Sequence, residues 1–135
     1  MPIQALEADI KSTAMALGSD GAHAAPKLRK LQSSLNKLLF SIEDKNLLLL
    51  SFFLDSFIDN LFFNLSGDVP YSEVIHSIIS NIFKSLGKPL ENIANGLNKV
   101  NFNVCTDAFG EMVNIYLEGL KHIQEKTSEE VNIFD

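Results

Sequence analysis

Two carboxylates stand four residues apart in the most apolar stretch of the chain. Asp55 and Asp59 lie within Asn46–Ser66, where most other residues are Leu, Ile or Phe. In a helix, this spacing places both side chains on one face. Such a pair could form a paired-carboxylate site or contact a basic residue of a partner, and it could also be a structural row neutralised by Lys or Arg from the preceding helix. We expect the structural role, because polar rows on core helices usually serve solvation or packing specificity.

The histidines offer weaker chemistry. His76 falls on the polar face of an expected helix, and the Ser and Ile residues after it do not match the Lys and Gly that follow a phosphotransfer histidine. His122 lies four residues after Glu118, a spacing at which two side chains can share a divalent metal ion. Two ligands do not complete a metal site, so we predict neither a metal nor another cofactor.

Cys105 is the single cysteine, and it stands near an expected helix start. A helix N-terminus lowers the pKa of a nearby thiol, but a nucleophile also needs a placed base, and the spacing of the histidines assigns none to this role. The chain contains no Gly-x-Ser-x-Gly element and no phosphate-binding loop of the Gly-x-x-x-x-Gly-Lys type. We therefore predict that the protein is not an enzyme.

Composition limits the class of protein. The 135 residues are 46% hydrophobic, which fits one domain with a real core. A net charge of −6 argues against a nucleic-acid-binding module, which needs a basic surface. With one cysteine and no classical signal sequence, we expect a cytoplasmic protein, and secretion that does not use a cleaved signal stays open as an alternative.

Apolar periodicity predicts an all-α, compact bundle of five to six helices around a central apolar helix at about residues 46–66. The central helix is long enough to cross a membrane, but Asp55 and Asp59 interrupt it, so we predict a buried core helix and no membrane span. Residues 1–135 form one domain. Within it, we expect a semi-detached N-terminal helix over residues 1–17, a flexible connector over residues 18–26 and a frayed acidic tail over residues 127–135.

Without catalytic motifs, the expected function is a non-enzymatic protein–protein interaction module of the adaptor, chaperone-like or inhibitory type. The expected partner is another protein, with a basic surface if it meets the acidic C-terminal helix, and a symmetric homodimer is a further option. The candidate contact residues are apolar ones on the first helix and acidic ones on the last: Leu6, Ile10, Leu17, Glu111, Glu118 and Glu125. The alternative function is a carrier or sensor of a small apolar ligand held between helices.

Overall fold

Six α-helices and one short 3-10 helix make up the described part of the chain. The computed structural model describes residues 2–38, 43–65 and 72–133. In chain order the elements are α1 (Pro2–Asp20), η1 (Gly21–Ala24), α2 (Ala25–Leu38), α3 (Lys45–Leu65), α4 (Glu73–Ser85), α5 (Gly87–Asn98) and α6 (Phe102–Ile133). The prediction of a compact all-α fold is confirmed.

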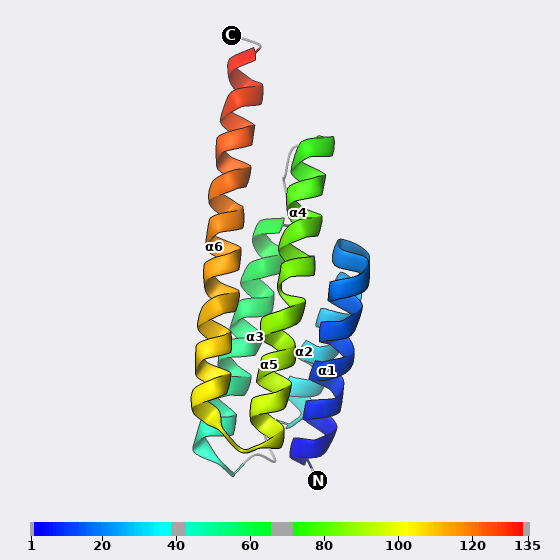
Figure 1. The fold of residues 1–135 in the computed structure, drawn as a ribbon, viewed down its shortest axis with the longest axis vertical. Helices are drawn as coiled ribbons and strands as arrows, with labels where there is room; N and C mark the ends of the chain where they lie inside the picture. The colour runs from blue at the N-terminus through cyan, green and yellow to red at the C-terminus, as the bar shows by residue number, and fades with distance from the viewer. Residues whose placement is uncertain (1, 39–42, 66–71, 134–135) are drawn as a thin grey trace.

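Helices α4 and α5 stack nearly end to end, and α6 runs back alongside both of them (Figure 1). The Ser72 hydroxyl caps α4 by accepting a hydrogen bond of 3.2 Å from the Ile75 amide. Only Leu86 separates α4 from α5, and its backbone is itself helical. Glycine often ends a helix, but Gly87 is the first residue of α5.

Gly87 instead allows α1 to approach α5 closely. A Cβ atom at Gly87 would lie 2.8 Å from the carbonyl oxygen of Ala14 and 3.0 Å from the amide nitrogen of Gly18, both backbone atoms of α1. The contact between these two helices is the most extensive in the fold. The prediction of a semi-detached first helix is wrong, because α1 is an integral wall of the core.

The predicted flexible connector over residues 18–26 is also wrong. Helix α1 continues to Asp20, η1 follows at once, and α2 begins at Ala25. Gly21 makes this path feasible with a φ of +57°, which glycine adopts at little cost. Its Cα also lies close to Ser80 of α4, where a Cβ would come within 3.1 Å of the Ser80 carbonyl oxygen. The segment is thus a packed corner.

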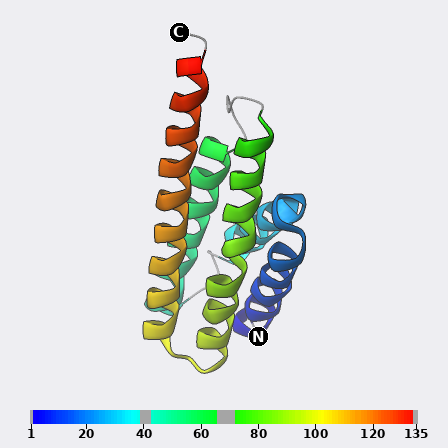
Figure 2. The same cartoon turned by 45° about the horizontal axis from the view of Figure 1, so that its top comes forward.

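Helix α3 lies at the edge of the bundle, and this corrects the prediction of a central helix. Asp44 caps it, since the carboxylate accepts hydrogen bonds from the amides of Asn46 (2.9 Å) and Leu47 (3.1 Å). The helix packs mainly against α2 and α6, and Phe62 also meets Phe83 of α4 with ring centroids 6.1 Å apart. Figure 2 shows α5 between α3 and α1. By length and composition, α3 alone among the described helices could cross a membrane, a test that the core helices of soluble proteins also pass.

Helix α6 is longer at both ends than the range of about Asp107–Lys126 that its apolar periodicity predicts. It begins at Phe102. Thr106 precedes the predicted range, and its residue type predicts an N-cap there. In the structure, Thr106 lies inside the helix, and its hydroxyl donates to the Phe102 carbonyl at 2.8 Å. It ends at Ile133, so the predicted frayed tail at 127–135 is helical as far as the structure describes it. Leu39 and Ile42, which apolar periodicity places on the buried face of the second helix, lie outside the described residues.

Candidate functional site

The outward face of α3 carries large apolar side chains in contact with solvent. Leu49 is 52% exposed, Phe52 48%, Phe53 53% and Phe63 82%. The opposite face of the same helix is buried in the core, through Leu47, Leu50, Ser51, Leu54, Phe57, Ile58, Leu61 and Leu65. Helix α3 is therefore apolar on two sides, only one of which the described fold covers.

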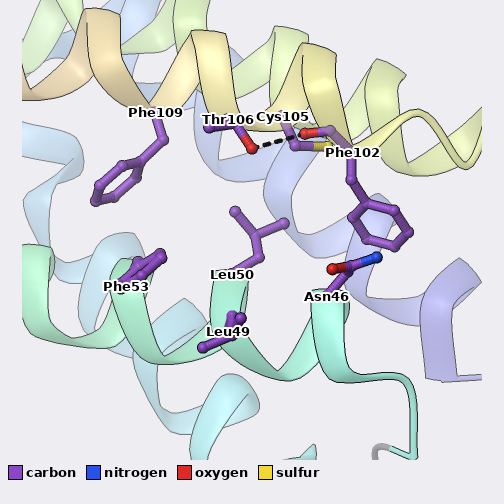
Figure 3. A pocket seen from close by; sticks show the side chains of 8 residues that line it. All are labelled: Asn46, Leu49, Leu50, Phe53, Phe102, Cys105, Thr106 and Phe109. Carbon is purple, nitrogen blue, oxygen red and sulfur yellow. Dashed lines mark hydrogen bonds between the residues drawn. The ribbon is translucent and has the colours of Figure 1, made fainter.

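A pocket opens between this face and the start of α6. Its volume is about 220 Å³, and Figure 3 shows that its α3 wall comes from Asn46, Leu49, Leu50 and Phe53. The α6 wall is formed by Phe102, Cys105, Thr106 and Phe109. Because its lining is mostly apolar, the pocket suits an apolar group rather than a charged one.

Aromatic contacts hold α3 against α6 beside the pocket. The ring of Phe109 stacks on Phe53 with centroids 5.8 Å apart, and it meets Phe57 edge to face at the same distance. Further along, Tyr116 packs edge to face on Phe57 and donates its hydroxyl to the Asn60 carbonyl at 3.0 Å. These contacts fix both walls of the pocket.

The thiol of Cys105 faces the pocket from its floor but is almost wholly buried. It donates a weak hydrogen bond to the Ile93 carbonyl, with 3.4 Å between sulfur and oxygen. Burial raises the pKa of this thiol, which is the opposite of the lowered pKa expected for a cysteine at a helix start. The raised pKa keeps Cys105 protonated near neutral pH, so it is a packing residue and a poor nucleophile.

Asp59 belongs to a polar cluster at the contact between α2 and α3. Its Oδ1 atom accepts hydrogen bonds from Gln32 Nε2 at 2.7 Å and from Arg29 at 3.0 Å. Arg29 is the cation from the preceding helix that the sequence led us to expect. Its guanidinium group also lies 4.2 Å from the centroid of the Phe62 ring. The hydrogen bonds from Gln32 and Arg29 lower the pKa of Asp59.

Asp55 does not share this arrangement. Its backbone carbonyl accepts from Gln32 at 3.3 Å, but its Oδ1 atom is buried and has no hydrogen-bond partner among the described residues. The hydroxyl of Ser51, one helical turn earlier, is also buried and also has no hydrogen-bond partner among the described residues. The two carboxylates that share a face in the sequence therefore have different surroundings, and the geometry of Asp59 is that of a structural ion pair.

The predicted partner-binding residues fall into two groups. Leu6, Ile10 and Leu17 are buried in the core of the protein, with exposures of 1% or less, so they are not available to a partner and that prediction is corrected. Glu111, Glu118 and Glu125 are exposed on α6. Glu118 and His122 also line a shallow depression against α4. Among the described residues, no group of three His, Cys, Asp or Glu could hold a metal ion.

The exposed face of α3 was missed by sequence reasoning. Leu49, Phe52, Phe53 and Phe63 were assigned to a helix that its neighbours wrap on nearly all sides. The available signal was the near absence of a polar face on α3, which fits either burial on all sides or burial on one side plus a docking surface. Periodicity alone does not separate these two cases, because both give the same pattern.

Comparison with known proteins identifies no relative. No family model, no curated protein and no solved structure matches this chain significantly.

Proposed function

We propose that this protein is a non-enzymatic interaction module that binds another polypeptide through the outward face of α3 and the adjoining pocket. The carrying observation is the exposure of Leu49, Phe52, Phe53 and Phe63 on one helix. With about 200 Å² for a whole aromatic side chain, the four expose on the order of 450 Å². Monomeric proteins rarely leave a contiguous apolar surface of this size without using it.

The arrangement of this face suits protein recognition. Binding energy at interfaces is concentrated in a few apolar or aromatic anchors that enter pockets at the centre of the contact. The pocket between α3 and α6 can receive one such anchor, and Phe52 and Phe63 can enter a partner. An absence of catalytic groups around the pocket supports binding rather than catalysis: its polar lining residues are Asn46, Cys105 and Thr106, and burial raises the pKa of the Cys105 thiol.

Site-specific photo-crosslinking tests this proposal. A photoreactive phenylalanine analogue at Asn60, which is exposed on the proposed face, is expected to give a discrete protein adduct in cells expressing the protein. The matched control is the same analogue at Ser77, which is exposed on α4. Equal labelling from both positions, or none from Asn60, would contradict the proposal.

A second candidate function is supported by the pocket itself. Its volume of about 220 Å³ is adequate for a small aromatic or short aliphatic compound, since an apolar cavity of about 150 Å³ can hold benzene. This role predicts a bound compound in native mass spectrometry of gently purified protein. It also predicts that small aromatic compounds raise the melting temperature of the wild-type protein and not of Leu50→Trp, in which the larger side chain fills the pocket. A bare mass and an unchanged melting temperature would argue against it.

A further inference from the structure

The apolar face of α3 has a protruding end and a hollow end. Phe63 is the most exposed of the large apolar side chains in the described chain, at 82%. Leu49 lies at the mouth of the pocket, 14 residues earlier, which is about 21 Å along the helix. Both positions face outward, and two heptads separate them, so they lie on the same side of α3.

Ser56 stands midway between these two ends. It is seven residues from Leu49 and seven from Phe63, it is exposed, and its small side chain allows close approach of a second helix. A surface with a projection and a hollow placed symmetrically about a small residue is complementary to itself under a two-fold rotation.

We propose that a second copy of this chain covers the face, with the two α3 helices antiparallel and crossing at Ser56. This geometry places Phe63 of each chain against Leu49 of the other, at the mouth of the pocket. The inference rests on the proposed function, and it identifies the binding partner as a second copy of the chain.

The small charge on this face argues against an acidic or basic partner and permits the approach of a second copy. Each chain carries a net charge of −6, so two copies repel unless the contact is uncharged. Between Leu49 and Phe63, Asp59 is the only charged residue among the exposed positions of α3, and Arg29 of its own chain neutralises it. The acidic residues Glu111 and Glu118 lie on α6.

The polar side chains on the face do not oppose its burial. Asn60 donates its amide to the Ser56 carbonyl at 2.9 Å, and Asn64 donates to the Asn60 carbonyl at 3.2 Å. The two amide nitrogens keep these hydrogen bonds when water leaves, which lowers the cost of burying them.

The exposed apolar area is adequate for a dimer. Burial of the four large side chains in both copies removes roughly 900 Å² from solvent, and the residues around them bring the contact into the range of about 1,200–2,000 Å² that is typical of stable complexes.

Disulfide trapping tests the geometry. In a Cys105→Ala background, Ser56→Cys places two thiols at the two-fold axis, and we expect rapid formation of a covalent dimer under mild oxidation. Asn60→Cys is the matched control, because in an antiparallel pair its two copies are roughly 12 Å apart along the helix axis, beyond the reach of a disulfide. Equal trapping of both variants would indicate a parallel or random contact and would overturn the proposal.

The molecular mass in solution tests whether a second copy of the chain covers this face. Sedimentation velocity on the purified wild-type chain is expected to give a dimer, and Phe63→Glu is expected to raise the dimer dissociation constant at least about thirtyfold, as for an interface hot spot. Val74→Glu, at a half-exposed apolar position on α4, is the control and is expected to leave it unchanged. A monomer at all concentrations, or a monomer that sediments with phosphatidylcholine vesicles, would overturn the proposal that a second copy covers this face. A photo-crosslink from Asn60 to a different polypeptide would then leave the proposed function standing.

Discussion

Two helix contacts in this fold are built on opposite principles. Helices α1 and α5 meet at Gly87, where backbone atoms of Ala14 and Gly18 occupy the space in which a side chain would stand. Helices α3 and α6 meet through the rings of Phe53, Phe57 and Phe109, which hold the helices apart and leave a pocket of about 220 Å³. The first contact is buried at Gly87, whereas the second opens onto solvent.

The difference separates a structural contact from a binding surface. Close approach of two backbones leaves no room for a ligand or a partner side chain, and any added atom causes a clash. Large rings pack with gaps and expose their outer edges, which a partner can bury. We therefore assign a structural role to the α1–α5 contact and to the inner side of α3, and a binding role to the outer side of α3 with the adjoining pocket. The following changes test that division.

Leu54→Ala should have the largest effect on stability, because Leu54 is 1% exposed on the inner side of α3. Removing a buried leucine side chain costs about 3 kcal/mol of unfolding free energy. Phe63 faces outward, so Phe63→Ala should change the free energy of unfolding of the monomeric protein by less than about 0.5 kcal/mol. Urea denaturation at low protein concentration measures both. Similar losses for the two variants would show that the outer face is buried in the monomer.

Gly87→Ala should cost about 2 kcal/mol, because the new methyl group meets the backbone of Ala14 and Gly18, which cannot move without displacing α1. Gly110→Ala is the matched control, since a Cβ there has no neighbour within 4 Å. In a helix, the control should raise stability by about 0.5–1 kcal/mol. The same urea experiment measures both. A neutral Gly87→Ala would mean that α1 is loosely attached after all.

Tyr116→Phe should cost about 1 kcal/mol, because it removes the hydroxyl that donates to the Asn60 carbonyl and keeps the ring against Phe57. This change loosens the α3–α6 contact without creating a cavity. Thermal unfolding followed by circular dichroism measures the loss. An unchanged melting temperature would mean that the hydrogen bond from the Tyr116 hydroxyl to α3 adds no stability beyond the hydrogen bonds this hydroxyl makes with water.

Asp59→Asn should have the smallest effect, and the loss of stability should depend on pH. The folded state lowers the pKa of Asp59 from its ordinary value of 3.8, so the ionised form stabilises the fold above that value. This stabilisation is lost as pH falls through the folded-state pKa. The stability difference between wild type and Asp59→Asn should therefore be constant above about pH 5 and shrink below about pH 4. Urea denaturation across this range checks the trend, and a constant difference would mean that the pKa is not shifted.

Local features of the fold were predictable from local sequence. The caps by Asp44 and Ser72 follow from side-chain oxygens that accept from amides two or three residues ahead, which needs no knowledge of the rest of the chain. The Arg29 partner of Asp59 followed from the cost of leaving a carboxylate unpaired near a core. One error came at Gly18–Gly21, which was interpreted as a break although Gly21 is buried and packs closely against Ser80 of α4.

By itself, the sequence determined that this chain folds as one all-α bundle, because the spacing of its Leu, Ile and Phe residues is satisfied by helices that share a core. It did not determine which apolar face lies inside. For α3, both faces have the same chemistry, and only the positions of α2 and α6 decide that Leu54 is covered and Phe63 is not. Burial depends on neighbours that are distant in the chain, so the tertiary structure alone located the surface to which we assign the function.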